Sequence, residues 1–247
     1  MSMLAVLFVA ALWAGAQNAL AGGGSFITLP ALIFSGLDEK AANITSTLGM
    51  FPSQVATGWA GRRLATGTAQ VSVRTLVIVS LAGGAAGAIL LLATPTSVFA
   101  QLLPWLVLFA TGIFAWGSFA RRPGADGLLG PVPATAAQFA IAVYGGYFGG
   151  GIGFLMLAAL TMAGFAVRAA GGTKNLLAGV MNASAVVIFL FRYDADWLKV
   201  GVVAAGAVAG GLAGAWALDR VNEKALRVVV VAIGLALTVG LFLRDRP

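Results

Sequence analysis

The sequence contains no cysteine and no histidine among its 247 residues. Their absence excludes disulfide bonds, Cys/His metal sites and any Cys–His or Ser–His catalytic pair. No Gly-x-x-x-x-Gly-Lys-Ser/Thr segment is present either, so the chain is not expected to bind and hydrolyse ATP. We therefore expect no enzyme, no catalytic residues, no metal and no cofactor.

Charge is also scarce, at 9% of residues, whereas 60% are hydrophobic. A soluble domain carries about 25% charged residues, so this chain could not cover a water-exposed surface. The net charge of +7 comes from Lys and Arg that lie mainly between apolar runs. That placement is typical of charges that set membrane topology and not of a nucleic-acid site, so lipid is the expected surroundings and nucleic acid is not an expected partner.

Apolar runs long enough for helices recur along the chain, and the first is interpreted as a retained helix and not a signal peptide. A membrane-spanning helix needs about 20 residues. Residues 24–37 and 152–166 are shorter, and each follows a glycine cluster. The pattern predicts an all-α polytopic membrane protein with helices near 3–21, 24–37, 41–60, 71–93, 97–119, 132–149, 152–166, 168–191, 197–218 and 225–243.

The two short runs occupy matching positions in the chain. A shift of 128 residues gives eleven identities in the 27 positions from 22 to 48, without a gap. A shift of 127 aligns the small-residue segments 83–88 and 210–215, which we interpret as helix-packing surfaces. The chain is therefore predicted to hold two tandem transmembrane repeats, residues 1–122 and 129–247.

The orientation of the repeats depends on how many times each one crosses the membrane. Five crossings give an inverted 5+5 arrangement, and re-entrant short segments give a parallel 4+4 arrangement. The loop at Arg62 and Arg63 is purely basic, whereas its counterpart pairs Arg192 with Asp194 and Asp196. Loops on one side should share a charge bias, so the difference favours inversion with both termini on the outer side. The 4+4 arrangement remains the alternative.

Four short segments carry a resemblance to a known family. Residues 22–30 (GGGSFITLP) and 41–48 (AANITSTL) are repeated in weaker form at 149–154 (GGGIGF) and 171–176 (GGTKNL). Their order, in two copies over essentially the whole chain, resembles the TauE/SafE membrane permeases. The resemblance implies transport of sulfite, of organosulfonates such as sulfoacetate, or of related sulfur oxyanions, across a bacterial or archaeal inner membrane.

The short runs also suggest where an anion would bind. A helix that begins inside the membrane exposes backbone N–H groups and the positive end of its dipole. Paired interrupted helices at corresponding places point to the binding site of a transporter. The predicted substrate-binding residues lie at these breaks and on the following helices: Gly22, Gly23, Gly24, Ser25, Asn43, Thr45, Ser46, Thr47, Gln54, Gly150, Gly151, Gly153, Thr173, Lys174, Asn175 and Asn182.

Lys174 is the one cation well inside an apolar run. A charge at the centre of a membrane helix costs roughly 2.5–3.5 kcal/mol on insertion scales. No Asp or Glu lies within a predicted span to neutralise it, whereas an anionic substrate would. The alternative is that the side chain reaches to the nearer interface.

Together these features predict a secondary transporter for a small anion, bound between two broken helices. A channel-like anion pore and a structural membrane subunit are the alternatives. A homodimer through an apolar face is also considered.

Overall fold

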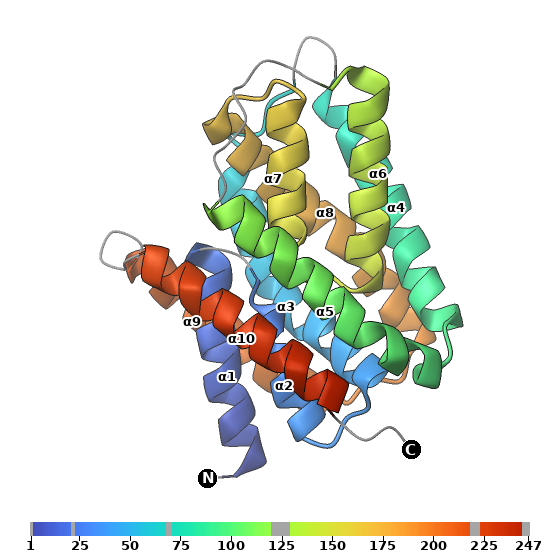
Figure 1. The fold of residues 1–247 in the computed structure, drawn as a ribbon, viewed down its shortest axis with the longest axis vertical. Coiled ribbons are helices and arrows are strands. Elements are labelled where there is room, and N and C mark those ends of the chain that lie inside the picture. The colour runs from blue at the N-terminus through green and yellow to red at the C-terminus, as the bar shows by residue number, and fades with distance from the viewer. Residues whose placement is uncertain (1, 21–22, 68–70, 120–128, 218–222, 244–247) are drawn as a thin grey trace.

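The structure is a computed structural model, and it describes residues 2–20, 23–67, 71–119, 129–217 and 223–243. Within these residues the protein is all-helical, with ten helices (Figure 1). They are α1 (Met3–Leu20), α2 (Ser25–Phe34), α3 (Glu39–Gly61), α4 (Val73–Ala93), α5 (Thr96–Phe119), α6 (Pro131–Tyr147), α7 (Ile152–Met162), α8 (Val167–Arg192), α9 (Trp197–Ala217) and α10 (Glu223–Leu243).

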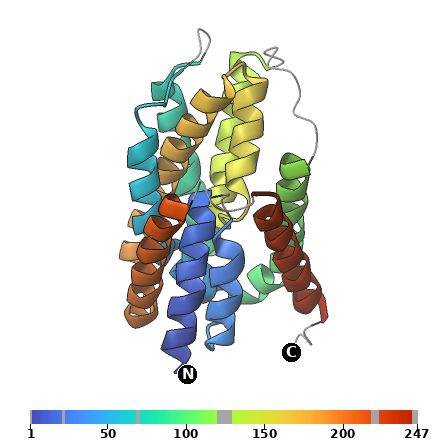
Figure 2. The ribbon, with the colours of Figure 1, turned by 90° about the vertical axis from the view of Figure 1, so that its left-hand side faces the viewer.

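Two helical hairpins enter the molecule from opposite ends. Figure 2 shows α1 and α2 in the lower half and α6 and α7 in the upper half, with the two breaks near the middle. The first break separates Leu20 from Ser25, and the second separates Tyr147 from Ile152. The two short helices predicted from the glycine clusters are thus confirmed as separate elements.

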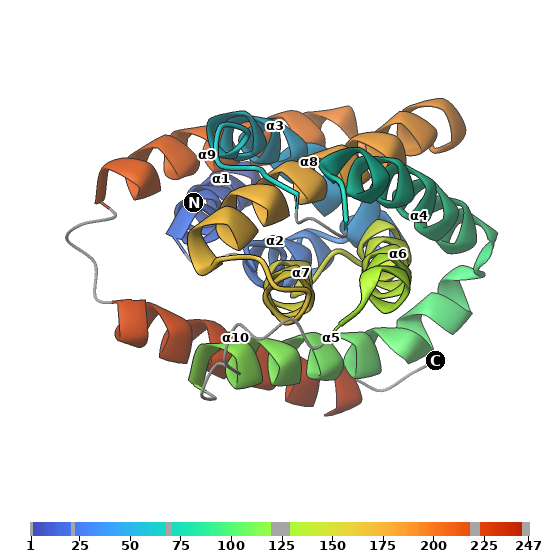
Figure 3. The ribbon, with the colours of Figure 1, turned by 90° about the horizontal axis from the view of Figure 1, so that it is seen from above.

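The longer helices pack around and between the two hairpins. α3 and α8 pack on each other along the middle, α1 packs along α9, and α6 packs along α4. α5 and α10 contact each other and lie together on one side of the bundle, as the view in Figure 3 shows. α1 begins and α10 ends at the same end of the molecule (Figures 1 and 2).

Glycine permits the close approach of two of these helix pairs. A Cβ at Gly210 would lie 1.8 Å from the carbonyl oxygen of Leu12, and one at Gly87 would lie 2.1 Å from that of Val143. No larger residue fits at either position without moving a neighbouring backbone. The small-residue segments 83–88 and 210–215 are confirmed as packing surfaces.

The outer surface is rich in large apolar side chains, including Trp59, Ile78, Trp105 and Leu212, which are exposed. Such a surface suits lipid and not water. Among the described residues, four helices are long and apolar enough to cross a membrane: Val73–Ala93, Thr96–Trp116, Ala169–Arg192 and Trp197–Gly214. α3 has the length, but its polar side chains face the interior of the bundle instead of adding to an apolar span.

The side chain of Lys40 joins the start of α3 to the end of α4. Its Nζ donates hydrogen bonds to the carbonyl oxygens of Leu92 (2.9 Å) and Thr94 (2.7 Å). Carbonyls at the end of a helix lack partners within the helix, and a cation there also complements the helix dipole. The contact therefore ties the start of α3 to the C-terminal carbonyls of α4.

We predict that Lys40→Met lowers the thermal midpoint of the detergent-purified protein. Hydrogen bonds from a charged group contribute about 1.5–3 kcal/mol. Lys199→Met is the matched control, because Lys199 is paired with Asp196 at 3.0 Å near the surface, where such a pair contributes about 0–1 kcal/mol. Equal midpoints for the two variants would contradict this role of Lys40.

Candidate functional site

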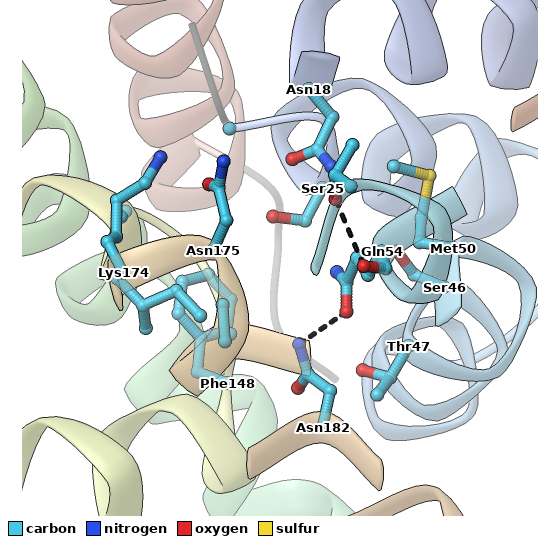
Figure 4. Close-up of a pocket in the computed structure, with 17 residues that line it drawn as sticks. Asn18, Ser25, Ser46, Thr47, Met50, Gln54, Phe148, Lys174, Asn175 and Asn182 are labelled. Carbon is cyan, nitrogen blue, oxygen red and sulfur yellow. Dashed lines mark hydrogen bonds between the residues drawn. The ribbon is translucent and has the colours of Figure 1, made fainter. Parts of the chain in front are cut away.

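A small polar cavity lies where the two hairpin breaks meet α3 and α8. Its volume is about 80 Å³, enough for several water molecules or one small ion. It is lined by Asn18, Gly23, Ser25, Ser46, Thr47, Met50, Gln54, Thr57, Phe148, Gly149, Gly151, Ile152, Gly153, Lys174, Asn175, Ala178 and Asn182 (Figure 4).

Twelve of the lining residues form six pairs that are 128 positions apart in the sequence. One pair, Gln54 and Asn182, is in direct contact, because the Asn182 amide nitrogen donates a hydrogen bond to Gln54 Oε1. The other five pairs are Gly23 with Gly151, Ser25 with Gly153, Ser46 with Lys174, Thr47 with Asn175, and Met50 with Ala178.

The N-terminal ends of α2 and α7 open on this cavity. Gly23 (φ +81°) and Gly151 (φ +73°) both adopt left-handed backbone conformations that favour glycine. Neither helix has a side-chain hydrogen bond capping its start. Two sets of helix-terminal amides, each at the positive end of a helix dipole, therefore face one small space.

Lys174 adds an amine that can carry a positive charge at the same place. Its Nζ is 3.7 Å from the position that a Cβ would take on Gly153, in the first turn of α7. Figure 4 shows the side chains of Lys174 and Asn175 extending side by side, across the cavity from Asn18 and Ser25. None of the lining residues is acidic. A cation next to the positive end of a helix is unfavourable by itself, and an anion between them would remove the repulsion.

Several of the polar side chains already have protein partners, so they contribute to the shape of the cavity. Thr47 Oγ1 donates to the carbonyl oxygen of Asn43, Thr57 Oγ1 donates to that of Gln54, and the Ser46 hydroxyl is 2.6 Å from that of Thr28. The Thr28–Ser46 bond joins α2 to α3, and the other two bonds lie within α3. Within the described residues, no hydrogen bond engages the side chains of Asn18, Ser25 or Asn175, which remain available for a ligand.

Ten of the sixteen residues predicted from the sequence line the cavity. Gly22 lies outside the described residues. The ten are Gly23, Ser25, Ser46, Thr47, Gln54, Gly151, Gly153, Lys174, Asn175 and Asn182.

The other five do not line the cavity. Thr45 is fully buried, Asn43 donates to the carbonyl oxygen of Tyr147, and Thr173 exchanges hydrogen bonds with the backbone of Thr66. Gly24 and Gly150 serve close packing: a Cβ would lie 2.6 Å from the Ala14 carbonyl oxygen and 2.5 Å from the Phe148 ring, respectively. All five support the residues around the site.

Seven lining residues were not among those predicted: Asn18, Met50, Thr57, Phe148, Gly149, Ile152 and Ala178. Helical periodicity could have found two of them, because Met50 and Thr57 continue the face of Thr47 and Gln54 at spacings of three and four. Ala178 then follows from Met50 through the 128-residue shift. Asn18 is a polar residue in the last turn before the break and carries the same signal as Ser25 after it. The sequence holds no comparable signal for Phe148 or Ile152.

Comparison with known proteins agrees with this architecture. The model of the family described as sulfite exporter TauE/SafE matches residues 7–241. A probable membrane transporter protein, ORF9, of a Sinorhizobium species is 32% identical over 252 residues, covering 97% of this chain and 92% of the relative. A probable membrane transporter protein of Haemophilus influenzae is 29% identical (96% and 93% covered), and YfcA of Escherichia coli K12, also a probable membrane transporter protein, is 26% identical (97% and 89% covered).

The helical bundle and these relatives define a multi-pass membrane protein of the transporter class, and not an enzyme. More narrowly, the chain belongs to the TauE/SafE sulfite exporter family.

We predict that Gly151→Ala destabilises the protein and disturbs the cavity. The left-handed backbone costs a non-glycine residue about 1–2 kcal/mol, and the new methyl group would lie 3.1 Å from Ala110. Gly112→Ala in α5 is the control, because its Cβ would meet no atom within 4 Å. Thermal unfolding should show a lower midpoint for Gly151→Ala alone, and equal midpoints would contradict the assignment.

Proposed function

We propose that the protein is a secondary transporter that moves a small sulfur-containing anion, such as sulfite or an organosulfonate like sulfoacetate, across the inner membrane. The anion binds in the central cavity between the starts of α2 and α7. The observation that carries this proposal is Lys174 beside the first turn of α7, in a cavity whose described lining includes no carboxylate.

The chemistry of the cavity supports a sulfur oxyanion. A sulfite or sulfonate group offers three oxygens, which can accept hydrogen bonds from backbone amides, from the Lys174 ammonium group and from the amides of Asn18 and Asn175 at once. A cavity of about 80 Å³ suits such a group and excludes a drug-sized molecule, whose sites measure about 300–1,000 Å³. The family name points to the same class of substrate.

The arrangement of the cavity also supports an inverted duplication. The hairpins enter from opposite ends, and the helix contacts of the two halves match. The contact of α1 with α9 corresponds to that of α6 with α4. The contact of α5 with α10 is its own equivalent, because exchanging the halves exchanges these two helices. Residues that are equivalent in two halves contact each other only near the axis that relates the halves. The Gln54–Asn182 hydrogen bond therefore supports an inverted arrangement whose axis passes through the cavity in the bilayer plane.

We predict that Lys174→Met abolishes or strongly weakens sulfite binding to purified protein, measured by thermal shift and calorimetry. The variant loses the positive charge but keeps an unbranched side chain of similar length. The matched rescue is the double variant Ser46→Lys/Lys174→Ser, which moves the ammonium group to the equivalent position of the other half. If the anion lies on the axis, this swap should recover much of the lost affinity.

Unchanged sulfite affinity in Lys174→Met would remove Lys174 from the site. In liposomes, a transporter should show saturable uptake and counterflow of labelled sulfite. Uptake that never saturates and shows no counterflow would support a channel-like pore instead.

We also predict that the starts of the two halves face opposite sides of the membrane. Single cysteines can be introduced directly, because the chain has none. Cysteines at Ser2 and Asp194 should react with an impermeant thiol reagent from one side, and cysteines at Thr66 and Pro131 from the other. Labelling of Ser2 and Pro131 from the same side would contradict the inverted arrangement.

A further inference from the structure

Of the side chains that the structure describes, Lys174 is the only titratable one that lines the central cavity. The elements packed around it present neutral groups: Gly153 from α7, Ser46 and Gln54 from α3, Asn18 from α1 and Ser25 from α2. Asp196 forms an ion pair with Lys199 at the start of α9, and neither residue lines the cavity. Among the described residues, no carboxylate therefore balances the Lys174 ammonium group in the cavity.

The net charge of the cavity then depends on whether an anion is bound. When the Lys174 ammonium group lies next to a bound monoanion, their charges cancel and the cavity has no net charge. An empty cavity with a neutral Lys174 amine also has no net charge. The two other combinations leave one uncompensated charge inside the membrane, at a cost of several kcal/mol. The two forms that carry no net charge are the ones that can rearrange between the two sides at the lowest energy.

We propose that Lys174 is the proton carrier of the transporter: it takes up one proton when a monoanion binds and releases that proton when the anion leaves. This rests on the proposed function. The proton adds to the lone pair of Nζ, and no covalent bond to the anion forms or breaks. Proton and anion cross together, in the direction set by the product of their two gradients, and no net charge moves.

The coupling follows from linkage between the two ligands. A bound anion favours the protonated amine, and by reciprocity a proton on Lys174 favours the anion by the same factor. If the ammonium group instead stayed charged throughout, the protein would move one negative charge per turnover and would respond to the membrane potential.

The first test measures proton uptake on binding. Methanesulfonate is the probe, because it stays ionised at any working pH and brings no proton of its own. Purified protein in weak buffer is mixed with methanesulfonate and a pH-sensitive dye, from about pH 6 to about pH 10, a range that includes the usual lysine region. At the alkaline end we expect about one proton taken up per anion bound, and an affinity that falls roughly tenfold per pH unit.

Lys174→Arg separates a positive charge from a releasable proton, because arginine stays protonated at all these pH values. Any methanesulfonate binding that this variant retains should be free of proton uptake and independent of pH. Proton uptake by Lys174→Arg equal to that of the wild type would overturn the assignment of the carrier to Lys174.

The second test uses the wild-type protein in liposomes with an internal pH dye and a potassium-set membrane potential. Coupled movement predicts that a methanesulfonate gradient changes the internal pH and that the flux ignores the potential. Flux that follows the potential without a pH change would overturn the coupling and leave the proposed function intact. No methanesulfonate binding at any pH would instead contradict the proposed anion site.

Discussion

The constraint on which the structure depends is that backbone N–H groups inside a membrane must have partners. A helix that starts within the bilayer leaves such groups exposed, and lipid cannot satisfy them. Here two helices start near the middle of the bundle, and both starts face the same polar cavity instead of the surface. The broken helices and the cavity therefore depend on each other, because neither would be tolerated alone.

This dependence explains why much of the architecture could be predicted from the sequence. A short apolar run after a glycine cluster has few interpretations in a membrane protein, and the predicted repeat at 128 residues made the second break support the first. The apolar runs located all ten helices to within a few residues. What could not be predicted is where the short helices lead. α2 and α7 run back toward the end from which α1 and α6 began, and in that direction α2 packs on α10 and α7 packs on α5.

Only part of the candidate site could be predicted from the sequence, for a similar physical reason. Polar residues spaced along one face of a helix, such as Thr47 with Gln54 and Asn175 with Asn182, can be assigned to the interior from periodicity alone. Asn43 and Thr173 satisfy the same criterion, but their side chains donate hydrogen bonds to the carbonyl oxygens of Tyr147 and Thr66, which are more than 100 residues away. Sequence reasoning identifies polar groups that need a partner inside the bundle. It cannot distinguish a backbone carbonyl from a ligand as that partner.

The two predicted halves differ in charge at one pair of positions in the cavity. At one pair of equivalent positions the first half has Ser46, which bonds to Thr28 within its own half, and the second half has Lys174. Two lysines would leave two like charges in a cavity of about 80 Å³, which one monoanion could not neutralise. With no lysine, only the helix ends would hold the anion. A single lysine matches one monoanion in charge, such as hydrogensulfite or a simple sulfonate, so in the proposed function the departure from symmetry at this position suits a substrate that binds as a monoanion.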